Sequence, residues 1–144
     1  MKYRRAKLMQ AAACGLCAAI TWRYGSSLQG TEFSRGWLTG VFLDMKDVGS
    51  LLLFLALLLT FFFRRTAAAI ALIACLLCLP LYLCFTAPGL FRRVFSNAEW
   101  SVPLRASFVW DNWSITGIVV LAITTYVGVR GLLLAGDSQS RNSA

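Results

Sequence analysis

The 144-residue chain contains no histidine and few charged residues. Histidine is the commonest metal ligand and a frequent general base, so its absence excludes His-ligated haem, His-containing zinc sites and the usual Ser-His or Cys-His catalysis. Charged residues make up 14% of the chain and hydrophobic residues 58%, whereas soluble domains are about a quarter charged. The composition therefore argues against a soluble globular protein, and the length leaves room for one domain.

The formal net charge of +8 would also suit a protein that binds nucleic acid. Here, however, the basic residues are scattered between long apolar runs. That distribution is typical of the charges that orient helices in a membrane. We therefore expect the lipid bilayer to be a partner of the chain, and we expect no nucleic acid.

Two runs have the length and composition of a membrane-spanning helix, which needs roughly 20 mostly apolar residues. Thr66 to Ala87 contains no charged residue, and Ser114 to Ala135 contains one, Arg130, near its end. We expect both runs to span the bilayer. Pro88 should follow the end of the first of them, with a kink or break near Pro80.

A further run, Val48 to Phe63, is slightly short for a span. We expect its helix to begin earlier, near Val41 or Trp37, so that Asp44, Lys46 and Asp47 lie at the level of the headgroups. There the two acids would complement the positive end of the helix dipole.

The first apolar segment has two interpretations. Leu8 to Thr21 is short, weakly apolar and follows a basic start. A secretory signal peptide has the same features. We expect an uncleaved first span and keep a removed signal peptide as the alternative.

Together these runs predict an all-α integral membrane protein with four transmembrane helices and one long outer loop between the third and fourth. Residues 1–144 would form a single membrane domain. The expected spans lie near residues 8–24, 41–63, 66–87 and 114–135, with a tail over 136–144.

The charges predict how this chain is oriented. With four spans, the N-terminus, the Arg64-Arg65 turn and the C-terminal tail share one side, which carries eight basic residues and one acid, Asp137. The other side carries six basic residues and five acids. Because basic residues favour the cytoplasmic side, we expect a multi-pass protein of the cell (inner) membrane with both termini in the cytoplasm. All five tryptophans then fall on the outer side, as interfacial anchors or as an aromatic platform for a ligand, lipid or partner.

Four of the five cysteines form two C-x-x-C pairs, Cys14 with Cys17 and Cys75 with Cys78. Such pairs could serve a thiol-disulfide site or a four-thiolate metal site. Their expected depth, near the middle of the membrane, disfavours the reactive thiolate, and no basic residue lies near them within the spans. The alternative is packing, because the pairs lie on helix faces of small residues. We expect the first and third helices to pack directly through those faces, and the Leu- and Phe-rich second helix to face lipid.

The remaining chemistry is sparse. The apolar cores of the spans contain no Asp or Glu, which counts against a coupled transporter, and we expect neither a metal nor a cofactor. The loop before the fourth span is long and aromatic, and long loops are usually functional. We predict that Trp100, Arg105, Trp110 and Asp111 in this loop contact a partner or lipid headgroup, since aromatic and arginine side chains often dominate interfaces.

The leading hypothesis is a non-enzymatic accessory or structural subunit of a membrane assembly, with a protein partner or a second copy of the chain in the membrane. A membrane thiol-disulfide oxidoreductase that uses the two C-x-x-C pairs is the first alternative. A small transporter is the second.

Overall fold

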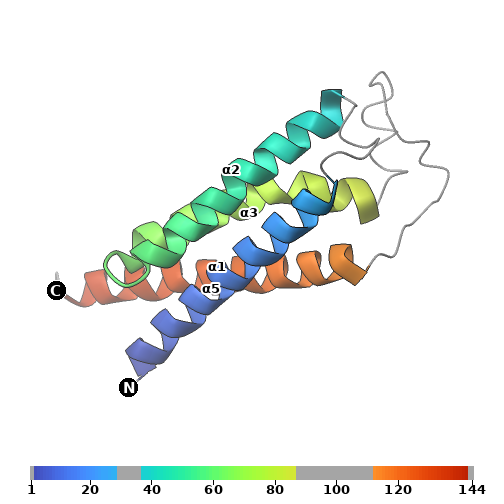
Figure 1. Cartoon of the computed structure of the whole chain (residues 1–144). Coiled ribbons are helices and arrows are strands. Elements are labelled where there is room, and N and C mark those ends of the chain that lie inside the picture. The colour runs from blue at the N-terminus through green and yellow to red at the C-terminus, as the bar shows by residue number, and fades with distance from the viewer. Residues whose placement is uncertain (1, 29–36, 87–111, 143–144) are drawn as a thin grey trace.

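The computed structural model describes residues 2–28, 37–86 and 112–142, and all regular structure within these ranges is helical (Figure 1). The prediction of an all-α chain is confirmed for this part. The four helices are α1 (Lys2–Leu28), α2 (Trp37–Leu59), α3 (Arg64–Thr86) and α5 (Asn112–Asn142).

The helices form an up-down-up-down bundle (Figure 1). Helix α1 packs on α2 and α5, and α3 packs on the same two helices from the opposite side. The start of α1, the turn between α2 and α3, and the end of α5 lie together at what we call the turn end. The end of α1, the start of α2, the end of α3 and the start of α5 lie at the far end. The expected grouping of both chain ends with the Arg64-Arg65 turn is therefore present in the fold.

Two helices of the described part are long and apolar enough to cross a membrane. Their apolar stretches run from Arg64 to Cys84 and from Ile115 to Leu133, and they match the two clearest spans expected from the sequence. At 1.5 Å per residue, α2 is about 34 Å long, which exceeds the roughly 30 Å of a hydrocarbon core. However, α2 carries Asp44, Lys46 and Asp47 in its first half, so its composition alone does not mark it as a span.

Several helix boundaries differ from the expected ones. Helix α1 begins before residue 8, and α5 continues through the residues expected to form a tail. Helix α2 ends at Leu59, four residues early, because the chain turns at Thr60, whose hydroxyl donates to the Ala56 carbonyl at 2.7 Å. Helix α3 runs through Pro80 without a break, as helices of packed bundles can when neighbours satisfy the freed carbonyl.

Glycines set the closest approaches between helices. A methyl group at Gly49 of α2 would lie 2.5 Å from the Cys78 Sγ and 3.1 Å from the Ala74 carbonyl oxygen of α3. At Gly117 of α5 a methyl group would overlap the ring of Tyr82. Such positions admit no side chain, and they bring α2 and α5 close to α3.

The expectation that α1 and α3 pack directly through their small faces holds only for a few side chains, such as those of Cys17 and Cys75. Both faces do point inward, since Cys14, Ala71 and Ala74 are buried. But α1 and α3 lie on a diagonal of the bundle, and α2 and α5 supply most of their neighbours. The Gly15 of α1 accordingly faces α2, where a methyl group would lie 2.9 Å from the Leu57 side chain.

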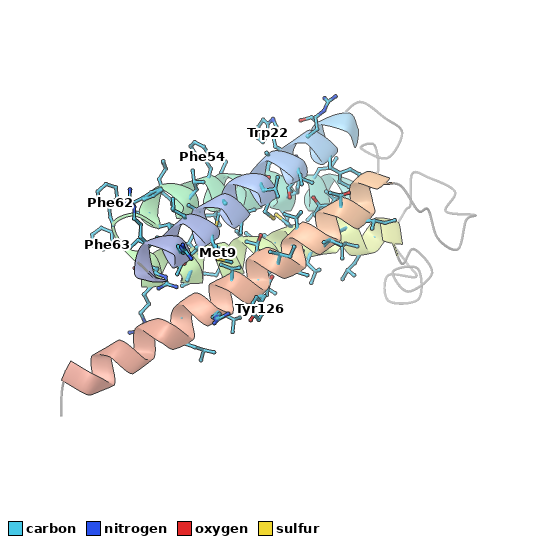
Figure 2. All side chains as sticks on the ribbon, turned by 90° about the horizontal axis from the view of Figure 1, so that it is seen from below. Met9, Trp22, Phe54, Phe62, Phe63 and Tyr126 are labelled. Atoms are coloured by element: carbon cyan, nitrogen blue, oxygen red, sulfur yellow. The ribbon has the colours of Figure 1, made fainter. Side chains whose placement is uncertain are left out.

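Helix α2 is also only partly the lipid-facing helix that its composition predicts. Leu57 packs against the core, while Leu53 and Ala56 are buried. The outward face carries Leu51, Phe54 and Leu58, which are exposed (Figure 2).

We expect Gly49→Leu to destabilise the bundle, because the added side chain has to displace the α3 backbone at Ala74. Overpacking of this kind costs about 1–3 kcal/mol. Gly40→Leu is the matched control on the same helix, where a Cβ meets nothing within 4 Å. Thermal unfolding in detergent measures both variants, and equal midpoints would contradict the close α2–α3 contact.

Candidate functional site

Lys46 of α2 is buried inside the bundle. Among the described residues it is the one charged residue classed as buried, and its side chain is 1% exposed. An ammonium group out of water is costly unless charged or polar partners compensate it. The groups around Lys46 therefore have to compensate its buried positive charge.

Helix geometry explains why Lys46 points inward. It lies four residues before Ser50 and seven before Leu53, which are both buried, and residues with this spacing share one helix face. Across the interface, Gly25 of α1 leaves the space that Lys46 fills, because a methyl group there would overlap the lysine from Cδ to Nζ.

The partners of the Lys46 ammonium lie at the α1–α2 surface. Its Nζ forms an ion pair with Asp47, whose side chain is 35% exposed. The same atom lies 5.5 Å from the ring centroid of Trp22, which is exposed, a distance at which a cation and an aromatic face attract each other. The aliphatic part of the Lys46 side chain is thus buried, and Asp47 and Trp22 compensate its ammonium charge at the edge of the bundle.

Polar groups continue inward from this lysine. The buried Ser50 hydroxyl has no hydrogen-bond partner within the part of the chain that the structure describes. Nearer the bundle axis, the hydroxyls of Thr21 and Tyr82 share a hydrogen bond of 3.0 Å. Tyr82 also stacks on Tyr24, with ring centroids 5.4 Å apart. The far end of the bundle therefore has a polar, aromatic interior. We call Lys46, Asp47, Ser50 and Trp22 the lysine cluster.

The headgroup level expected for Asp44, Lys46 and Asp47 stays a prediction. The structure shows that Asp44 is exposed, whereas Lys46 points into the bundle. The burial of Lys46 was readable from its helical spacing to the apolar face of α2, combined with a glycine at matching depth in α1. A buried charged side chain with specific partners is a candidate functional group, so the lysine cluster is the candidate site.

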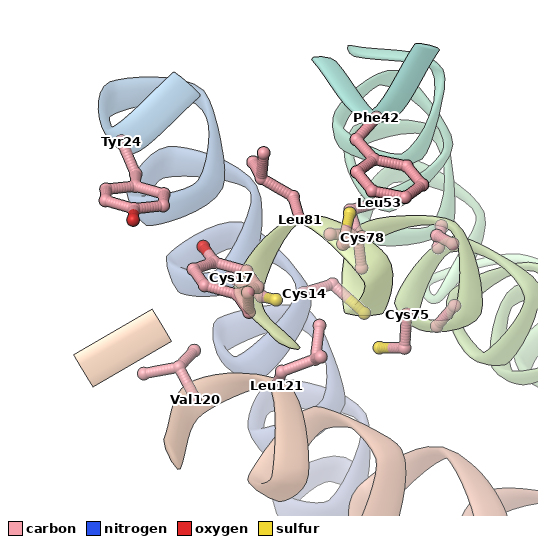
Figure 3. Packing of buried hydrophobic residues seen from close by; sticks show 14 of the residues in the cluster. Cys14, Cys17, Tyr24, Phe42, Leu53, Cys75, Cys78, Leu81, Val120 and Leu121 are labelled. Carbon is pink, nitrogen blue, oxygen red and sulfur yellow. The ribbon is translucent and has the colours of Figure 1, made fainter. Parts of the chain in front are cut away.

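The structure also brings the four cysteines of the two C-x-x-C pairs together (Figure 3). The Cys17 side chain lies beside those of Cys75 of α3, Thr124 of α5 and Thr21. Cys14 and Cys78 lie close enough to Cys17 to interact with it electrostatically. All five thiols are free and buried, and among the described residues no group of three or more ligand residues is arranged to hold a metal ion.

The thiols that lie together in the structure are not the two thiols of one C-x-x-C motif. Residues three apart on a helix have Cβ atoms about 5–6 Å apart, whereas a disulfide needs about 3.5–4.5 Å. The structure instead pairs Cys17 with Cys75 across the bundle. Beside this pair, the buried Thr124 hydroxyl of α5 donates a hydrogen bond of 3.2 Å to the Ala13 carbonyl of α1.

The predicted partner contacts Trp100, Arg105, Trp110 and Asp111 lie outside the described residues, so they stay predictions. Three of the tryptophans expected on one side do fall in helical segments at the far end, namely Trp22, Trp37 and Trp113. For these three, the expected one-sided distribution is present in the fold.

No protein-family model matches the chain, and no curated protein or solved structure matches it significantly.

We expect Gly25→Leu to expel the Lys46 side chain and to destabilise the α1–α2 contact. Lys46→Ala removes the obstructing atoms, so the double variant should recover part of the loss. The two substitutions should couple by about 1 kcal/mol or more, within the range for contacting residues. The same cycle with Gly40→Leu serves as control, and strict additivity at Gly25 would show that the lysine does not occupy this space.

Proposed function

We propose that the chain is a small integral membrane protein that serves as a non-enzymatic accessory or structural subunit of a membrane assembly. The observation that carries this proposal is the distribution of apolar side chains. Large apolar residues cover the outward face of every helix (Figure 2), including Met9, Phe54, Leu76 and Ile123. The interior, in contrast, is rich in alanine, cysteine, threonine and glycine. Such an arrangement suits lipid or partner helices outside and close helix packing inside.

We further propose that all four helices cross the cell (inner) membrane, with both chain termini in the cytoplasm. Support comes from the helix lengths and from the basic side chains gathered at the turn end, including Arg4, Arg5 and Arg65. Basic residues favour the cytoplasmic side of a membrane. The tryptophans of the far end would then lie at the outer interface, where indole rings are commonly found.

A structural role accords with a filled interior. Side chains fill the space beside the interior glycines, since Lys46 lies against Gly25 and Tyr82 lies against Gly117. A carrier has to open a path along the axis, whereas a subunit needs a stable shape and an outer surface. The chain would expose that surface to a protein partner or to a second copy of itself.

Site-specific photo-crosslinking in native membranes tests this proposal. A photoreactive residue is placed at Leu76 or Ile123, which are exposed, and at the buried Ala74 as control. We expect a defined protein adduct from an exposed position and none from Ala74. If every exposed position labels lipid alone and the purified chain is a monomer in nanodiscs, the subunit proposal is wrong.

A second candidate function, a membrane thiol-disulfide oxidoreductase, is favoured by the Cys17–Cys75 pair. In this reaction the two thiols lose two electrons and two protons and form one S–S bond. A membrane-soluble quinone would take up both and become the hydroquinone. The buried position of the pair suits a lipid-soluble oxidant better than a soluble one.

We expect mild oxidation to link Cys17 to Cys75, because the helices hold the members of each C-x-x-C pair apart. Peptide mass spectrometry identifies the linkage, and Cys78→Ser is the control that should leave it intact. A Cys14–Cys17 disulfide as the main product would contradict the geometry. Reduction of a quinone by the reduced chain, lost in Cys75→Ser, would favour the enzyme over the subunit.

A further inference from the structure

The charges of the bundle are strongly segregated. Among the residues whose side chains are described, the turn end carries six basic residues and no acid: Arg4, Arg5, Lys7, Arg64, Arg65 and Arg130. The described acids, Asp44 and Asp47, lie toward the far end, where Arg23 and Lys46 balance them. The turn end is therefore a concentrated positive surface, and the far end has no formal net charge among these side chains.

Contacts between helices hold the basic groups at one level. The Lys7 Nζ donates to the Phe61 carbonyl at 3.0 Å, which fixes the start of α1 on the α2–α3 turn. The buried Gln10 donates to the Arg64 carbonyl and accepts from the Arg64 Nε, both at 3.4 Å. The surface is thus built from three segments that are distant in sequence.

Helix α5 completes this surface. Gly131 lies against Gln10 and Ala68, where a methyl group would be 3.1 Å from the Gln10 Oε1. Arg130 therefore lies within about one helical turn of the arginines that begin α3. Its Nη1 donates to the Tyr126 hydroxyl at 3.4 Å, and both side chains are exposed (Figure 2).

Exposed phenylalanines adjoin the basic residues. Phe61, Phe62 and Phe63 of the α2–α3 turn are 50%, 79% and 65% exposed (Figure 2). They immediately precede Arg64 and Arg65 in the chain. A soluble anion or a nucleic acid would satisfy the arginines and leave these rings in water. A phospholipid presents a phosphate and an acyl chain side by side, and so matches both parts.

We propose that the turn end is a binding surface for anionic phospholipids, with headgroup phosphates on its arginines and acyl chains against Phe61–Phe63. Guanidinium groups bind phosphate oxygens in a bidentate manner, which favours headgroups over diffuse counterions. This inference rests on the proposed membrane location, and it adds the class of lipid that the surface selects.

The test reconstitutes the full chain in vesicles of phosphatidylcholine, with or without phosphatidylglycerol. Spin-labelled phosphatidylglycerol and phosphatidylcholine then report the relative association of each lipid with the protein. We expect the wild type to prefer phosphatidylglycerol, and Arg65→Gln to lower this preference about five-fold, the equivalent of about 1 kcal/mol per basic residue near an anionic surface. High salt should reduce the preference of the wild type.

Two variants control the test. Arg23→Gln removes an exposed arginine from the far end and should leave the preference unchanged. Arg65→Lys keeps the charge but not the bidentate geometry, so it should lose less of the preference than Arg65→Gln does. Equal selectivity of Arg65→Gln and Arg23→Gln, or no preference in the wild type, would overturn the proposal. Extraction of the chain by alkaline carbonate would instead overturn the membrane location itself.

Discussion

Close approach between helix backbones is the constraint on which the rest of this bundle depends. In the proposed membrane location, apolar side chains would gain little by leaving lipid, so the helices would associate through packing and hydrogen bonds. Gly49 brings α2 onto α3, Gly117 brings α5 onto Tyr82, and Gly25 makes room for Lys46. Each of these contacts holds a polar or sulfur-containing side chain in the interior. The polar interior is thus a consequence of the glycine contacts.

The burial of Lys46 illustrates how this constraint accommodates charge. The aliphatic stem of a lysine can pack like an apolar side chain while its ammonium group reaches a polar partner. Here the stem fills the space beside Gly25, and the ammonium reaches Asp47 and the Trp22 ring. Removal of the carboxylate would leave the charge inside without its ion-pair partner, which is far costlier than replacement of the whole pair by apolar residues. Both members of the pair belong to α2, so the contact with α1 comes from the Lys46 side chain, which lies against Gly25 and Trp22.

The sequence predicted the fold class and the two clearest spans, because long uncharged runs are a local property of the chain. It also predicted that the chain ends and the Arg64-Arg65 turn lie together, since short connections make successive helices antiparallel. It did not predict the neighbours of α1. Inward-facing small residues on α1 and α3 have the same pattern whether those helices are neighbours or lie across a diagonal. The burial of Lys46 was not predicted for a related reason, because a charge close to the end of an apolar run is ordinarily an interfacial residue.

The contacts that tie α1 to the α2–α3 turn have a consequence for the order of assembly. Lys7 and Gln10 bind groups 54 residues further along the chain, at Phe61 and Arg64. During synthesis α1 therefore leaves the ribosome well before these partners exist. The α2–α3 hairpin, by contrast, is joined by a short turn and can form as soon as its second helix is complete. In the proposed membrane location, α1 would have to remain without these partners until the hairpin has formed, and α5 would pack last.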